Sequence, residues 1–168
     1  MCIRDRFSAF LADAVGPEGR VYSVEASRGA SKDARRNLLG AEQAIVLNGP
    51  TDKVLGSWLK HPERAVADGG LADTAVDTVV LDPPRSGAGR RAVERILALR
   101  PGRIVYVSCD PASFARDLAW LREGGYEVER ARVFDLYPDT HHLESVTVLR
   151  PAADLVAAPA VVETPAAE

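Results

Sequence analysis

Short apolar segments rich in valine and isoleucine alternate with segments of helical periodicity, and this alternation restricts the fold more than any other feature of the chain. The strand-like segments cover residues 20–26, 44–49, 77–84 and 103–109. The helix-like segments place apolar residues three or four positions apart within residues 31–39, 90–99 and 111–121. Strands that alternate with helices form a parallel sheet through right-handed crossovers. The sequence therefore predicts a doubly wound α/β domain with a mostly parallel sheet.

The two ends of this domain depart from the alternation. Residues 126–138 and 144–150 are strand-like with only a loop between them, which predicts an antiparallel last pair. Residues 151–168 are mainly Ala, Pro and Val without a usable period, and we expect them to be a disordered tail. At the front, residues 7–19 have the pattern of a first helix and its C-terminal stop.

A nucleotide-binding domain of this type normally begins with a strand and a glycine-rich turn that open onto the first helix. Here only the six residues MCIRDR precede that helix. We therefore expect residues 1–6 to be a non-native leader. Residues 7–150 are expected to be an incomplete domain in which the first strand and the glycine loop are missing.

Composition excludes several classes of protein. The 168 residues, 46% of them hydrophobic, suit one globular domain, and no apolar run approaches the roughly 20 residues that cross a bilayer. Two cysteines are too few for a disulfide framework, which together with the lack of a secretory signal predicts a cytoplasmic protein. The net charge of −3 argues against general electrostatic binding of nucleic acid. No feature indicates an oligomeric state.

Three reactive side chains end predicted strands, namely Glu25, Asp82 and Cys109. Ligands of open α/β sheets bind at the carboxyl ends of the strands, so we expect these side chains to line one edge. Glu25 stands where nucleotide binders keep a carboxylate for ribose hydroxyls. A role at the start of the next helix is the alternative, although Ser27 is the better cap. The two prolines after Asp82 force the chain out of the sheet as a stiff loop.

Cys109 lies directly before a predicted helix N-terminus, because Asp110 is a good N-cap and Pro111 a good first helical residue. The partial positive charge at such a terminus favours thiolate over thiol. This position suits a nucleophile, while a buried structural cysteine remains the alternative.

Glu144 is the candidate general base, at the start of the last predicted strand and beside His141 and His142. Two histidines and a carboxylate also suggest a metal site. Adjacent histidines diverge in a strand, however, and a third well-spaced ligand is not evident. We therefore expect no metal.

Three segments in this order and spacing, LDPPRSGAG, YVSCDPASFARDL and DLYPDTHHLESVTVL, resemble the catalytic domain of the S-adenosylmethionine-dependent RNA (uracil-5-)-methyltransferases. The resemblance covers about residues 7–150, and the pair SCDP and HxES is specific to that family. It implies a Rossmann-like class I methyltransferase fold, S-adenosylmethionine as cofactor, and an unpaired uridine of tRNA or rRNA as substrate. It also implies Cys109 as nucleophile, Glu144 as proton-abstracting base, and Glu25 and Asp82 as cofactor-site carboxylates.

Such chemistry explains why a thiol and a carboxylate are both needed. Addition of the thiolate to carbon 6 makes carbon 5 of uracil nucleophilic, and a base must later remove the proton from carbon 5. One departure from the family is the run Asn48, Gly49, Pro50, where an adenine-contacting acidic residue is expected. Two alternatives remain: a small-molecule or amino-group methyltransferase in which Cys109 is structural, and a remnant without catalytic activity.

Overall fold

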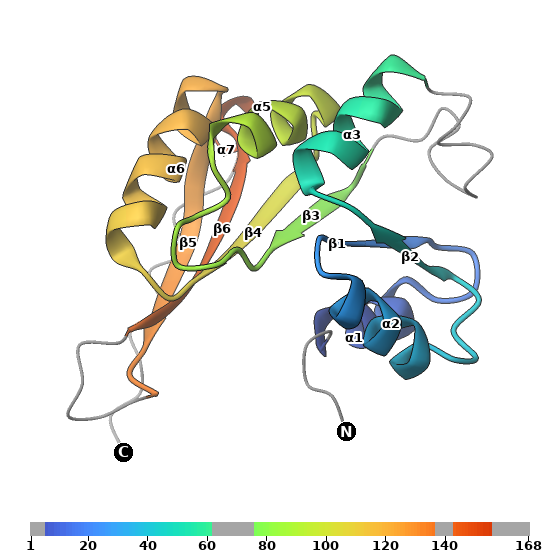
Figure 1. Ribbon diagram of the computed structural model, residues 1–168. Coiled ribbons are helices and arrows are strands. Elements are labelled where there is room, and N and C mark those ends of the chain that lie inside the picture. Colours follow the sequence, from blue (N-terminus) through green and yellow to red (C-terminus); the bar gives the residue numbers. More distant parts are fainter. Residues whose placement is uncertain (1–5, 62–75, 137–142, 156–168) are drawn as a thin grey trace. The chain divides into compact units, whose positions relative to one another are not determined.

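The computed structural model describes residues 6–61, 76–136 and 143–155 (Figure 1). The chain divides into two compact units, Met1–Ala75 and Val76–Glu168. None of the helices in the described residues combines the length and the apolar character that a membrane span requires.

The first unit contains a two-stranded parallel sheet. Its elements, in chain order, are α1 (Arg6–Val15), β1 (Val21–Glu25), α2 (Arg28–Asn37), β2 (Ala44–Asn48) and α3 (Thr51–Lys60). Figure 1 shows α1 and α2 on one side of the β1–β2 pair and α3 on the other. The register runs from Val21 opposite Ala44 to Glu25 opposite Asn48, so both strands end at the same edge.

Both faces of this small sheet are covered. Val21 is buried, as are Ala30 and Ala34 of α2. The next residue of β1 points to the opposite face, where the ring of Tyr22 meets Trp58 of α3 edge-on at a centroid distance of 5.4 Å. Apolar residues therefore occupy both faces of these mostly apolar strands, as the sequence suggested for a sheet covered on both sides.

The second unit contains a four-stranded mixed sheet. Its elements are β3 (Thr78–Leu81), α5 (Arg90–Leu99), β4 (Arg103–Ser108), α6 (Pro111–Glu123), β5 (Tyr126–Phe134), β6 (Glu144–Pro151) and α7 (Ala152–Leu155). The strand order is β3–β4–β6–β5. Strands β3 and β4 are parallel, whereas β6 is antiparallel to both of its neighbours, β4 and β5. The predicted antiparallel last pair is confirmed.

One face of the second sheet carries the core of the unit. Ile104 and Tyr106 of β4 are fully buried, while the intervening Val105 is only half-buried. The same face of β6 contributes Thr147 and Leu149, which pair with Tyr106 and Ile104. The helices add further buried side chains to this unit, namely Ala92, Val93 and Ile96 of α5 and Leu121 of α6.

The expected boundaries at the two ends are only partly within the described residues. Strand β6 extends one residue past Arg150, and the short helix α7 follows it directly. The rest of the expected tail, residues 156–168, lies outside the described residues, as do residues 1–5 of the expected leader.

Candidate active site

The turn from β4 into α6 holds Cys109 at the N-terminus of a helix. Oδ1 of Asp110 accepts a hydrogen bond from the backbone N–H of Ser113 at 2.8 Å, which makes Asp110 the N-cap, and Pro111 follows at the first helical position. Oγ of Ser108 donates to the carbonyl of Asp110 at 3.0 Å and accepts from its N–H at 3.2 Å. Cys109, a half-buried free thiol between these two residues, therefore sits in a fixed turn.

The register of the sheet brings Cys109 and Glu144 to the same edge. Ser108 of β4 lies opposite Ser145 of β6. Cys109 follows Ser108, and Glu144 precedes Ser145. Because the strands are antiparallel, the thiol and the carboxylate therefore stand next to each other just beyond the last pair. Neighbouring strands are about 4.8 Å apart, which is within reach of two side chains.

Asp82 reaches this edge from the adjacent parallel strand. Leu81 is the last residue of β3 and lies opposite Tyr106 of β4. Asp82 therefore leaves the sheet at the end of the strand beside the one that carries Cys109. Its carboxylate is solvent-exposed, yet the surrounding protein desolvates it enough to raise its pKa. The second unit thus assembles three of the four predicted site residues along one edge.

Glu25 belongs to the first unit. Its Oε1 accepts a hydrogen bond from the backbone N–H of Ser27 at 2.8 Å, and Oγ of Ser27 in turn accepts from the N–H of Ala30 at 3.3 Å. Ser27 is the N-cap of α2, as predicted. Because Glu25 accepts a hydrogen bond in this turn, the structure shows the alternative role at the start of the helix. The predicted role in binding ribose hydroxyls stays a prediction.

Asn48 supports the same turn from β2. Its side-chain amide donates to the carbonyl of Glu25 at 3.0 Å and to Oγ of Ser31 at 2.9 Å. The residue found in place of the expected acidic one therefore fixes the end of β1.

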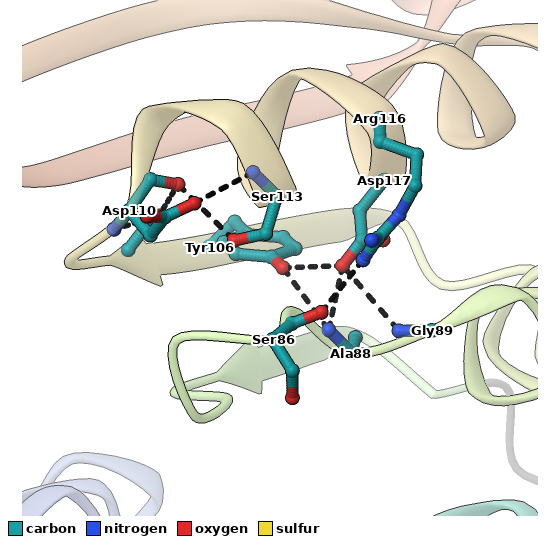
Figure 2. Close-up of polar contacts among 9 residues, drawn as sticks. Ser86, Ala88, Gly89, Tyr106, Asp110, Ser113, Arg116 and Asp117 are labelled. Atoms are coloured by element: carbon teal, nitrogen blue, oxygen red, sulfur yellow. Dashed lines mark hydrogen bonds and ion pairs between the residues drawn. The ribbon is translucent and has the colours of Figure 1, made fainter.

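A buried polar network that the sequence analysis missed holds the loop after Asp82 (Figure 2). The carboxylate of Asp117 on α6 is fully buried. Its Oδ2 accepts hydrogen bonds from the hydroxyl of Tyr106 and the N–H of Ala88, both at 2.6 Å, and a longer one from Gly89 at 3.4 Å. The pKa of Tyr106 is raised, mainly because the hydroxyl is buried and to a lesser extent because it donates a hydrogen bond to Asp117.

Arg116 completes this network at its solvent side. Its Nη2 lies 3.0 Å from Oδ1 of Asp117 and donates to the carbonyl of Ser86 at 2.7 Å. The residues of one helical turn thereby bind three positions of the loop that begins at Asp82. A signal existed in the sequence: Asp117 falls among Phe114, Leu118 and Leu121, on the apolar face of the predicted helix.

The structure does not describe His141 and His142, which lie outside the described residues. Within residues 6–61, 76–136 and 143–155, no three His, Cys, Asp or Glu side chains converge as metal ligands would.

Comparison with known proteins identifies the family. The family model described as tRNA (uracil-5-)-methyltransferase matches residues 60–151, which include the whole edge formed by Asp82, Cys109 and Glu144. The chain belongs to this family.

Relatives with similar sequences agree with the family assignment. An uncharacterized RNA methyltransferase of Streptomyces avermitilis is 44% identical over 147 residues, which are 88% of this chain and 31% of the relative. One of Listeria innocua is 39% identical over 131 residues, 77% of this chain and 26% of the relative. The chain thus spans about a third or less of the length of these family members.

Solved structures confirm the predicted Rossmann-like α/β methyltransferase fold. The tRNA (uracil-54, C5)-methyltransferase of Pyrococcus abyssi, crystallised with S-adenosyl-L-homocysteine, superimposes with a TM-score of 0.63 at 30% identity, over 85% of this chain and 31% of that one. Fibrillarin of Aeropyrum pernix, with bound S-adenosyl-L-methionine, reaches 0.59 at 18% identity over 86% of this chain and 62% of its own, a likeness of fold alone.

Proposed function

We propose that this chain carries the catalytic edge of an enzyme that methylates carbon 5 of an unpaired uridine in tRNA or rRNA. The observation that supports it most is the register of β4 and β6, whose last pair, Ser108 and Ser145, is followed by Cys109 on one strand and preceded by Glu144 on the other. Membership of the uracil-5-methyltransferase family supports the same assignment.

In the proposed reaction the Cys109 thiolate attacks carbon 6 of uracil and forms a sulfur–carbon bond. The electron pair of the C5–C6 double bond then forms a C4–C5 double bond while the C4–O4 π pair moves onto O4, and this enolate makes carbon 5 nucleophilic. After carbon 5 has accepted a methyl group, it carries both that group and a hydrogen atom. The Glu144 carboxylate removes this proton, the C5–C6 double bond re-forms, and the thiolate leaves carbon 6.

S-adenosylmethionine is the proposed methyl donor, and its sulfonium group makes the methyl group electrophilic. Each unit by itself offers a suitable group at a strand end, Glu25 in the first and Asp82 in the second, because carboxylates are hydrogen-bond acceptors for ribose hydroxyls and for an amino group. The exposed position of Asp82 at the carboxyl end of β3 supports this assignment.

Carbon 6 of a uracil stacked in a helix is inaccessible to a thiol in a sheet turn, so the target nucleotide must be unstacked. Loops and single strands allow this at the lowest cost. The mechanism also needs a reduced thiol, which agrees with a cytoplasmic location.

We further propose that this chain acts together with further sequence of the kind its longer relatives carry, and that this sequence supplies a first strand and a glycine loop. Calorimetry with S-adenosylhomocysteine tests this for the chain alone and for a chimera in which it replaces the matching segment of the Streptomyces relative. Binding by the chimera but not by the chain alone is expected. Equal binding by both would contradict the proposal.

The test of the mechanism uses that chimera and a stem–loop RNA with 5-fluorouridine in its loop. Fluorine cannot be removed as a proton, so a covalent protein–RNA complex should accumulate. Cys109→Ala should abolish both this complex and methyl transfer to unmodified RNA. Glu144→Gln should instead retain a methylated complex with unmodified RNA, because only the release step is blocked. Methyl transfer that survives Cys109→Ala would favour the small-molecule or amino-group alternative.

A further inference from the structure

Strand β5 contains a register shift just before its second half. Val128 lies opposite Leu149 of β6, but Arg130 lies opposite Val148, so Glu129 is an extra residue in the ladder. Successive residues of a strand point to opposite faces of the sheet. One extra residue therefore exchanges the faces of all side chains that follow it.

The pairs beyond the shift define which face each side chain takes. Arg132 lies opposite Val146, and Phe134 lies opposite Glu144. Side chains of directly paired residues stand on the same face. Arg130, Arg132 and Phe134 consequently share the face of the proposed base, Glu144.

The residue between the two arginines points to the opposite face, as this assignment of faces requires. Ala131 lies opposite Thr147, which is buried on the face that carries Tyr106 and the core of the unit. Without the extra residue, the two arginines would point to this core face. The shift is thus the feature that turns the basic and aromatic side chains toward the face of the proposed active site.

This row of side chains continues to the nucleophile. Phe134 on β5 lies opposite Glu144 on β6. The residue after Glu144, Ser145, lies opposite Ser108 of β4, and Cys109 directly follows Ser108. An aromatic ring, a carboxylate and a thiol thus occupy neighbouring positions across three strands. Phe134 is 40% exposed, so a large part of its ring is open to a ligand.

The charge of this half of β5 favours an anionic partner. Arg130 and Arg132 are both exposed. Both acidic side chains of β5 form ion pairs with other arginines: Glu129 pairs with Arg150 at 2.9 Å, and Glu127 pairs with Arg122 at 3.0 Å. Two guanidinium groups stand two residues apart, about 7 Å along an extended strand, an interval comparable with that between phosphates of an extended RNA strand.

We propose that Arg130, Arg132 and Phe134 form an RNA-binding strip that holds the strand next to the target uridine. The arginines bind successive phosphates, for which the guanidinium fork is well suited. The ring of Phe134 stacks on the base beside the unstacked uridine, as aromatic side chains do in single-strand recognition. This inference rests on the proposed function, and it names how the same site holds its RNA.

The test uses the same chimera and measures its affinity for a stem–loop RNA with a uridine in the loop, over a range of salt concentrations. Arg130→Gln combined with Arg132→Gln should weaken binding roughly tenfold and reduce the slope of log affinity against log salt by about 1.4, which is about 0.7 for each lost phosphate contact. The matched control is Arg91→Gln with Arg95→Gln, two exposed arginines of α5. It removes the same charge and should change neither quantity.

A third variant tests the face itself. Adding Ala131→Arg to the double variant restores one positive charge in the same strand but on the core side, and binding should not recover. Recovery there, an equal loss in the control pair, or no RNA binding by the unsubstituted chimera would show that the strip does not hold RNA. The covalent complex with 5-fluorouridine RNA keeps the two proposals separate: if that complex forms while the double variant binds RNA normally, only the strip is wrong.

Phe134→Leu keeps an apolar side chain and removes the stacking surface. We expect weaker RNA binding with an unchanged salt slope, since no phosphate contact is lost. A change in the salt slope, or unchanged affinity, would contradict the stacking role.

Discussion

The hydroxyl of Tyr106 lies 2.6 Å from Oδ2 of Asp117, and both side chains are fully buried. A buried carboxylate is stable only when hydrogen bonds and a positive charge replace its water. Here the N–H of Ala88 and the guanidinium of Arg116 supply them. The pair joins strand β4, helix α6 and the loop after Asp82, and these elements carry Cys109 and Asp82 of the candidate edge.

Replacement of Asp117 should lower the free energy of unfolding more than loss of the Tyr106 hydroxyl does. Asp117→Asn puts an amide donor against groups that are themselves donors, and we expect a loss of about 2–4 kcal/mol in the free energy of unfolding. Tyr106→Phe removes one hydrogen bond and should cost about 1–2 kcal/mol. Urea denaturation of both variants measures the difference. Equal effects would show that the carboxylate is not the centre of the network.

The loop approaches this network so closely that Gly87 has no room for a side chain. A Cβ there would lie 2.6 Å from Nη2 of Arg116 and 2.6 Å from Oδ2 of Asp117, at a φ of +82°. Gly89 has the same φ and nothing within 4 Å of its Cβ position. Gly89→Ala should cost about 1–3 kcal/mol for the backbone conformation alone, and Gly87→Ala clearly more. Thermal unfolding of the pair checks this, and similar losses would contradict the close contact.

The helix cap beside Cys109 should make stability depend on pH in the acidic range. The hydrogen bond from the backbone N–H of Ser113 lowers the pKa of Asp110 in the folded state. The stabilising contribution of the charged cap is therefore present above the unfolded pKa and is lost as pH falls through the folded pKa, below about pH 4. Asp110→Asn keeps a capping oxygen without the titration.

Chemical denaturation from pH 7 to about pH 3 compares the two proteins. The stability advantage of the unsubstituted protein over Asp110→Asn should stay constant down to about pH 5 and decrease below it. An advantage that is independent of pH would show that the charge of Asp110 contributes nothing to the cap.

The proposed cofactor role of Glu25 can be separated from its role in the turn. Glu25→Gln retains an amide oxygen that can accept the hydrogen bond from Ser27, but it loses the charge. We expect roughly tenfold weaker binding of S-adenosylhomocysteine, equal to about 1.4 kcal/mol, with little change in unfolding temperature. Calorimetry on the chimera measures the affinity, with Glu42→Gln, an exposed residue of the same unit, as control. Unchanged affinity would leave Glu25 with the turn alone.

Local signals explain which parts of the fold could be predicted from the sequence. Ser27 and Asp110 are caps in the structure because capping depends on residues three positions apart. The strands of both units follow from runs of β-branched residues. Helix α3 was missed, since Gly56 lowers its helix propensity and only Leu55 and Trp58 among its residues are buried.

Long-range relationships account for what the sequence could not show. Asp117 and Ala88 are 29 positions apart, so their hydrogen bond has no local pattern. The register shift at Glu129 depends on how β5 pairs with β6, and the alternation of the strand alone would have placed the arginines on the core face. Cys109, Asp82 and Glu144 were predictable as a group because all three stand at strand ends.

Strand β5 is the outermost strand of its sheet in the described part of the chain. An outer strand offers unpaired backbone groups to any other extended chain, which is the usual route to association between sheets. The two arginines that follow the register shift work against this, because a second copy aligned along the strand would bring like charges together. The side chains proposed to hold RNA would thereby also keep the protein from aggregating through its own edge.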